Sequence, residues 1–176
     1  MLKKAFIAFG IIIVVFFIIV AMKPDNFRIT RSMLMAAPAS AIFGHINNLH
    51  NWNVWSPWAK LDPNSKATYS GPVEGVGASF KWEGNDKVGV GTMTIVESRL
   101  NEYVKFNLEF IKPFAATNAA KFTLRPQGNG TLVTWSMSGT NNFMGKLMSV
   151  IMDCDKMVGG QFEKGLTDLK AIVEKK

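Results

Sequence analysis

Apolar and polar residues alternate differently in three parts of the chain. The first part, residues 5–22 (AFIAFGIIIVVFFIIVAM), contains no charged side chain. At about 1.5 Å per residue, a helix of this length nearly crosses the hydrocarbon core of a bilayer. A cleaved signal peptide is the alternative, but the run exceeds the usual apolar segment of such peptides and no small-residue cleavage site follows it directly. We predict a membrane anchor over residues 1–23 and a separate domain over residues 24–176.

The second part, residues 67–139, shows the period-two alternation of β-strands separated by turn signals. Six strands are predicted there, and FRITRSML (27–34) predicts one more before them. The Asn129-Gly130 dipeptide predicts a tight hairpin. One face of this antiparallel sheet is polar and the other carries large rings. The apolar phase includes Phe80, Trp82, Phe106, Phe110, Phe122 and Trp135, and Asn118 shares it.

The third part, residues 155–175, has the spacing of an amphipathic helix. Its apolar stripe consists of Val158, Phe162, Leu166, Leu169 and Val173. Gly159, Gly160 and Gly165 each cost about 1 kcal/mol of helix propensity relative to Ala. They indicate either close packing against the sheet or room for a ligand. Asp153 or Asp155 is expected to cap the start of this helix.

A strand, short helices over residues 38–47, six strands and a long final helix form a specific order. Together with three segments, that order resembles the START-like (SRPBCC) helix-grip superfamily, in particular its bacterial polyketide cyclase/dehydrase-like branch. The segments are RSMLMAAPASAIFGHINNLHNWNVWSPWAKLDP, YSGPVEGVGASFKWEGN and MDCDKMVGGQFEKGLTDLK. The resemblance implies an α+β fold in which a curved antiparallel sheet wraps around a long C-terminal helix. It implies no single activity, because the superfamily includes lipid carriers, hormone receptors and cyclases.

Three of the five tryptophans, Trp52, Trp55 and Trp58, stand within seven positions of a turn-rich segment. In the resembled fold this segment runs along the mouth between the sheet and the long helix. The rings either plug that end of the core or line a portal for an apolar ligand. Trp52 is the expected plug and Trp58 the expected portal residue, because Trp58 lies closest to Lys60 and Asp62, where the chain returns to solvent.

The formal charge of +7 does not predict nucleic-acid binding. Setting aside Lys3, Lys4 and Lys23 leaves 17 basic and 13 acidic residues, which are interspersed. No basic cluster with interleaved aromatic residues is present, and the residual charge fits a domain close to anionic lipid headgroups. Basic residues flank the apolar run on both sides, so the positive-inside rule does not decide its orientation. Only the short tail before the run favours an N-terminus in the cytoplasm and a domain outside it.

No catalytic set is visible in the sequence. His45 and His50 have no evident partner, and there is no G-x-S-x-G motif. A single cysteine, Cys154, excludes an internal disulfide and a multi-cysteine zinc site. The G-x-G segments neither complete a phosphate-binding motif nor open a helix. We therefore expect no cofactor and no metal, and we can name no acid or base.

These patterns favour a membrane-anchored module that binds a hydrophobic small molecule or lipid between the sheet and the final helix. The alternatives are a cyclase/dehydrase-like enzyme, which only the resemblance implies, and a ligand-free regulatory or interaction module with a filled core. The expected ligand-binding residues are Trp55, Trp58, Phe80, Trp82, Phe106, Phe110, Asn118, Phe122, Trp135 and Phe162.

Overall fold

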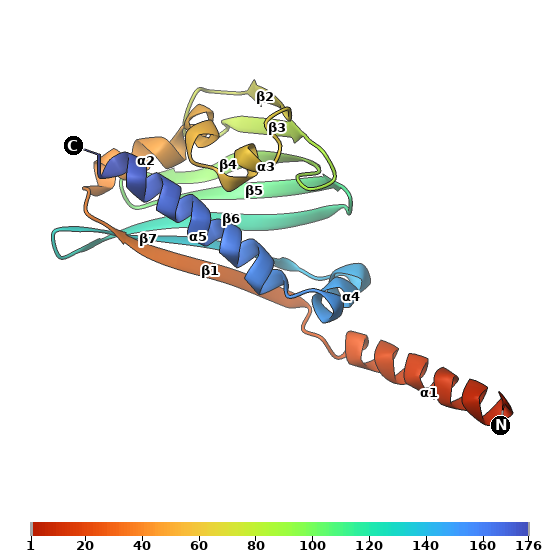
Figure 1. Cartoon of the computed structure of the whole chain (residues 1–176). Helices are drawn as coiled ribbons and strands as arrows, with labels where there is room; N and C mark the ends of the chain where they lie inside the picture. Colours follow the sequence, from red (N-terminus) through yellow and green to blue (C-terminus); the bar gives the residue numbers. More distant parts are fainter. Residues whose placement is uncertain (1, 176) are drawn as a thin grey trace.

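The computed structural model describes residues 2–175 and contains one long helix outside a curved α+β domain (Figure 1). Helix α1, Leu2–Ala21, projects away from the sheet, and its segment Lys3–Ala21 is long and apolar enough to cross a membrane. Only 6% of that segment is buried inside the protein, so α1 is not a helix of the protein core. An anchor and a signal sequence share these properties.

One seven-stranded antiparallel sheet forms the body of the domain, with the strand order β1-β7-β6-β5-β4-β3-β2. Each neighbouring pair is consecutive in sequence except β1 and β7, so the first strand closes the sheet beside the last. The strands are β1 Asn26–Met35, β2 Lys66–Ser70, β3 Ser79–Glu83, β4 Val90–Arg99, β5 Tyr103–Lys112, β6 Ala116–Gln127 and β7 Gly130–Thr140.

The hairpin between β6 and β7 is present, but its two-residue loop is Gly128-Asn129 rather than Asn129-Gly130. Gly128 has a φ of 57°, as the first loop position of a type II′ turn requires. Gly130 already belongs to β7, and a Cβ there would collide with the backbone carbonyl of Met35. Close approach of β1 therefore explains this glycine better than turn geometry does.

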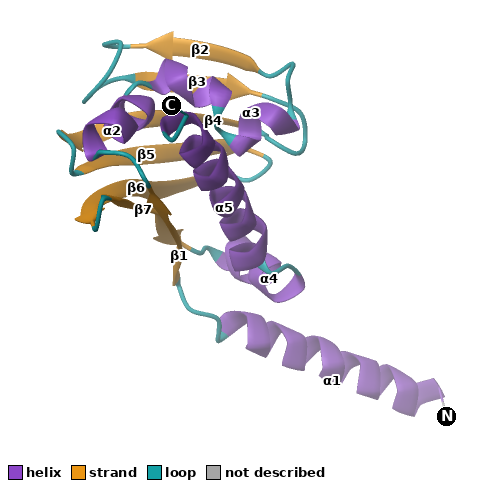
Figure 2. Ribbon diagram, turned by 60° about the vertical axis from the view of Figure 1, so that its left-hand side comes forward, coloured by secondary structure: helices purple, strands orange, loops and turns teal. Residues whose placement is uncertain are grey.

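Short helices connect β1 to β2, and two further helices follow β7. The first group consists of α2 (Ala39–Asn47), the 3-10 helix η1 (Leu49–Val54) and α3 (Pro57–Leu61). The second consists of α4 (Phe143–Ile151) and α5 (Cys154–Val173). Figure 2 shows α5 crossing the concave face of the sheet, with α2 and α3 beside it. This arrangement is the helix-grip fold that the sequence predicted.

Helix α5 packs on the sheet through the predicted stripe. Phe162, Leu166 and Leu169 are fully buried. Asp153 caps the helix, because its side chain accepts a hydrogen bond from the Lys156 backbone N–H at 2.9 Å. Gly165 permits a close approach: an added Cβ would stand 2.8 Å from the Trp135 ring and 3.0 Å from Pro57. Close packing, rather than space for a ligand, therefore explains this glycine.

Helix α4 was not predicted from the sequence, and it connects the domain to α1. Its Phe143 ring stacks on Phe17 of α1, with centroids 6.1 Å apart. Lys146 Nζ pairs with Asp25 Oδ1 at 2.5 Å, just after the end of α1. The backbone N–H of Asn141 donates to the Asp25 carbonyl at 2.6 Å. The C-terminal end of α1 is thus fixed to α4 by both stacking and polar contacts.

Candidate ligand-binding site

The inner face of the sheet is organised in rows that run across the strands. One continuous row, which we call the end row, crosses all seven strands near the β1 start and the β7 end. Each residue of the row is the register partner of the next. The end row consists of Phe27, Gly139, Asn118, Leu108, Met93, Phe80 and Tyr69.

Burial changes sharply between the end row and the row beside it. The neighbouring row, which consists of Ile29, Met137, Ala120, Phe106 and Ile95, is buried throughout. In the end row, by contrast, Phe27, Leu108, Phe80 and Tyr69 are only partly buried. Helix α5 begins beyond the end row, because its first turn contacts Arg31, four residues further along β1 than Phe27. The helix therefore leaves apolar side chains of the end row partly accessible.

The aromatic residues predicted to line the site form two separate clusters. The first, or inner, cluster brings together rings from the sheet, from η1 and α3, and from α5. Neighbouring ring centroids in it lie within 6.2 Å of each other. It consists of Trp52, Trp55, Trp58, Phe106, Phe122, Trp135 and Phe162. The second, or outer, cluster lies along the end row and next to it. It consists of Tyr69, Phe80, Trp82 and Phe110.

The inner cluster is packed like a protein core. Trp135 stacks on Phe162 with centroids 4.2 Å apart, which joins the sheet to α5. Trp52 and Trp55 are buried, and their indole N–H groups donate to the carbonyls of Ile46 and His45 at 3.0 and 3.2 Å. Their polar atoms are therefore satisfied within the protein. Trp58 differs from them because it remains partly exposed at the edge of the cluster.

The outer cluster is more accessible and is positioned by a glycine. Trp82 lies over Gly91 of β4, where an added Cβ would collide with the indole ring. The Trp82 N–H donates to the Val88 carbonyl at 3.2 Å, which fixes the ring orientation. Phe80 stacks on Trp82 at 5.7 Å, and Phe110 meets the other side of Trp82 edge-on. Phe80 and Phe110 are both partly exposed, so this cluster offers ring surface to a ligand.

Asn118 places an amide among these apolar groups. Its residue is 9% exposed and stands between Gly139 and Leu108 in the end row. Among the hydrogen bonds of residues 2–175, none involves its side chain. A Cβ at position 139 would collide with the Asn118 side-chain oxygen, so Gly139 provides the space for the amide. The amide has no protein partner in the described part of the chain and keeps some access to solvent, so it is available to hydrogen-bond a polar group of a ligand.

Ionised groups lie around the site rather than in it. Arg31 bridges β1 and α5: its Nε donates to Glu163 Oε1 at 2.6 Å and its Nη2 to Asp155 Oδ2 at 2.9 Å. The hydrogen bond to Asp155 is the main cause of a raised pKa of Arg31, and it lowers the pKa of Asp155. Gly159 lies directly beneath the guanidinium group. This ion pair fixes the start of α5, on the far side of the buried row from the end row.

The ten residues predicted from the sequence to contact a ligand lie in three different places in the structure. Six of them lie in the inner cluster, three in the outer cluster, and Asn118 in the end row. The prediction missed Phe27, Tyr69, Met93, Leu108 and Gly139, which complete the end row. The alternation of Leu108 with Asn107 and Glu109 was the one available signal, because it gives Leu108 the phase of Phe106 and Phe110.

Two surface hollows include residues of the end row. One of about 230 Å³ lies at the β2 edge, where His50 stacks on Tyr69 at 3.9 Å; Leu49, Gly71 and Val73 also line it. A wider one of about 490 Å³ lies at the ends of β1, β6 and β7, where the end-row residues Phe27, Asn118 and Gly139 line it together with Asn107, Ala119 and Ser138. Among residues 2–175, no group of three or more His, Cys, Asp or Glu side chains is placed to hold a metal ion.

The comparisons with known proteins agree with this architecture. The family model described as polyketide cyclase / dehydrase and lipid transport matches residues 26–174. The chain therefore belongs to this family, and with it to the START-like helix-grip superfamily. No curated protein matches the chain significantly.

Solved structures with little sequence similarity share the fold. A crystal structure of a Chromobacterium violaceum protein has a TM-score of 0.61 and 14% identity, over 88% of this chain and 100% of that one. The Aha1 dimer from Colwellia psychrerythraea has a TM-score of 0.60 and 16% identity, over 84% and 96%. The di-domain ARO/CYC protein BexL has a TM-score of 0.62 and 11% identity, over 90% and 53%. At such identities the likeness shows the fold alone.

Proposed function

We propose that this protein is a membrane-anchored START-like domain that binds a hydrophobic small molecule or lipid at the end row. The observation that carries the proposal is the combination of half-exposed apolar side chains with one amide that has no protein partner among residues 2–175 and keeps some access to solvent. Ligand sites are typically apolar with a few placed polar groups. Phe80, Leu108 and Phe110 would contact an apolar ligand, and Asn118 would hydrogen-bond its carbonyl or hydroxyl group.

The two clusters have different roles in this proposal. The inner cluster, with Trp55, Trp135 and Phe162 buried against one another, forms the floor and supports the domain. The outer cluster would contact the ligand, together with Trp58 at the partly exposed edge of the inner cluster. Of the predicted residues, Phe80, Trp82, Phe110, Asn118 and Trp58 therefore remain ligand contacts, whereas the others act through packing.

Helix α1 would serve as the membrane anchor of residues 1–23. It is apolar from residue 5 to its end, and only 6% of the segment Lys3–Ala21 is buried by the protein. Exposing such a helix to water is unfavourable by roughly 25 cal/mol per Å² of apolar surface, so a bilayer is the environment that matches it. The anchor would then hold the domain of residues 24–176 permanently close to the membrane surface.

The test measures lipid recovered from the purified full chain. Leu108→Trp fills the end row, and Leu34→Trp is its matched control because Leu34 lies exposed on β1. All three proteins carry the same α1, so lipid that merely surrounds the anchor is equal in each. Organic extraction followed by mass spectrometry should show an apolar compound with wild type and Leu34→Trp, and much less with Leu108→Trp. Equal amounts in all three would contradict the proposal and favour a ligand-free module.

A further inference from the structure

Helix α4 is amphipathic, with Lys146 and Ser149 on its polar side, and the protein leaves its apolar side chains exposed or only partly buried. Its sequence, FMGKLMSVI, contains one charged residue, and no residue of the helix is buried. An amphipathic helix with an uncovered apolar face is suited to lie in a membrane interface, with that face toward the acyl chains. Phe143, Met144 and Ile151 are 53%, 40% and 64% exposed, respectively. The domain itself therefore leaves these apolar side chains uncovered.

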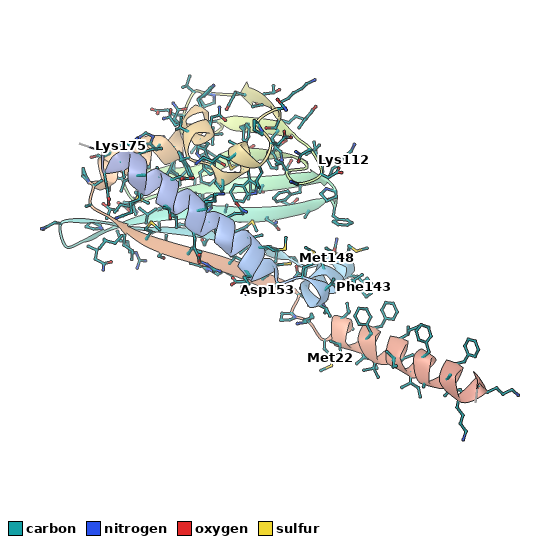
Figure 3. The ribbon with its side chains drawn as sticks, in the orientation of Figure 1. Met22, Lys112, Phe143, Met148, Asp153 and Lys175 are labelled. Atoms are coloured by element: carbon teal, nitrogen blue, oxygen red, sulfur yellow. The ribbon has the colours of Figure 1, made fainter. Side chains whose placement is uncertain are left out.

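The contacts between α4 and α1 indicate what covers it. Phe143 stacks on Phe17, which lies four residues before the end of α1 at Ala21. At about 1.5 Å per residue, Phe17 is about 6 Å deeper along α1 than its last residue. If α1 crosses a bilayer up to Ala21, the ring of Phe143 lies at the same depth as Phe17. Figure 3 shows Phe143 beside the base of α1, near Met22.

The polar groups of the junction are placed as a membrane interface requires. Lys146 is turned toward Asp25 and also donates to the Ala21 carbonyl at 3.4 Å. Lys23 lies two residues after the end of α1, and Lys156 is exposed in the first turn of α5. Basic residues at this position fit anionic headgroups. With Lys146 directed at the end of α1, the stripe of Met144, Leu147, Met148 and Ile151 is free to face lipid.

We propose that α4 lies in the membrane interface and holds the end row against the bilayer, so that the ligand is a molecule dissolved in that membrane. The inference deepens the proposed function and rests on α1 being an anchor. The register supports it: Asn26 pairs with Thr140 at the junction, and the next pair, Phe27 and Gly139, already belongs to the end row. An apolar molecule that enters from the bilayer therefore reaches ligand contacts without crossing water.

The first test measures the depth of α4 with a fluorescent label on the full chain. In a Cys154→Ser background, Met144→Cys and Ile151→Cys carry the label, and Leu100→Cys is the control, because Leu100 is 73% exposed at the opposite end of the sheet. The proteins are reconstituted into equimolar phosphatidylcholine and phosphatidylglycerol vesicles with a nitroxide-labelled lipid. Labels at 144 and 151 should emit further to the blue and lose most of their fluorescence to the lipid quencher. Labels at both positions that behave like the control would overturn the proposal.

Flotation of the same vesicles separates the two levels of the argument. A chain that does not float refutes the anchor and this inference together. A chain that floats, but whose labels at positions 144 and 151 report an aqueous environment, refutes only the placement of α4.

The second test asks whether α4 serves ligand uptake. The double variant Met144→Asp with Ile151→Asp keeps α1 and should float like wild type. It should lose the apolar compound that is recovered from the wild-type chain, whereas Leu100→Asp should retain it. Undiminished recovery from the double variant would overturn entry from the bilayer.

Discussion

The contrast between Trp52 and Trp58 gives the sharpest prediction about the tryptophan segment. Trp52 is 7% exposed and touches four other rings at 4.6 to 5.9 Å. Replacing a large core aromatic by Ala costs about 3–5 kcal/mol. Its lost N–H would also leave the Ile46 carbonyl without a donor, which places the cost near the upper end of that range. We expect Trp52→Ala to lower the free energy of unfolding by about 4–5 kcal/mol.

Trp58→Ala should lower the free energy of unfolding by less, because less of the Trp58 surface is buried. It touches two rings, Trp135 at 5.5 Å and Phe162 at 6.1 Å, and is partly exposed. Burial of such a part of the ring is worth about 2 kcal/mol. For a domain of this size, 1 kcal/mol shifts Tm by about 2–4 °C, so Tm should fall by about 12 °C for Trp52→Ala and about 6 °C for Trp58→Ala.

The assay is thermal unfolding of the full chain in detergent, followed by near-ultraviolet circular dichroism, which reports aromatic packing rather than α1. Val54→Ala is the control, because this neighbouring side chain is 62% exposed and should leave Tm nearly unchanged. Trp58→Ala should also weaken the binding of an apolar probe, whereas Trp52→Ala should affect stability first. Equal falls in Tm with unchanged probe affinity would refute the distinction between plug and portal.

Two further predictions concern α5. Gly165→Ala should lower Tm because its Cβ meets Trp135 and Pro57, at a cost of about 1–3 kcal/mol. The added Cβ of Gly160→Ala meets no atom within 4 Å, so this substitution should raise stability by up to about 1 kcal/mol. A Gly165→Ala protein as stable as the Gly160→Ala protein would contradict the close packing at Gly165. Because the pKa of Asp155 is lowered in the folded protein, its ionised carboxylate stabilises the fold at pH values above the ordinary pKa of about 3.9. This stabilisation is lost as the pH falls through the lowered pKa. Arg31→Gln should raise the Asp155 pKa toward its ordinary value in a carboxyl NMR titration; an unchanged pKa would show that Arg31 is not the cause.

The architecture could be predicted from the sequence because its signals are local. Alternation along β5 and β6 assigned Phe106 and Phe122 to the inner face, since side chains in a strand alternate with period two. The cap at Asp153 and the stripe through Phe162 were equally readable, because capping and helical spacing involve neighbouring residues.

The division of the rings into two clusters could not be read in this way. It depends on which residues of different strands stand side by side, and that register is set by turns and by the irregularity between Ile95 and Glu97. The phase of Phe80 and Phe106 is the same, yet the first lies in the end row and the second in the buried row. Helix α4 was missed although its apolar residues Met144, Leu147, Met148 and Ile151 have helical spacing, because a nine-residue segment offers only two turns of that pattern.

The central claim is that a membrane-derived apolar molecule occupies the end row. The most direct measurement uses the full chain in vesicles that contain a lipid with a photoreactive group in its acyl chain, followed by peptide mapping of the cross-links. The account predicts cross-links on β5 and β6 around Leu108 and Asn118, and their loss in Leu108→Trp. Cross-links confined to α1 and α4 would show lipid only around the anchor and would contradict the claim.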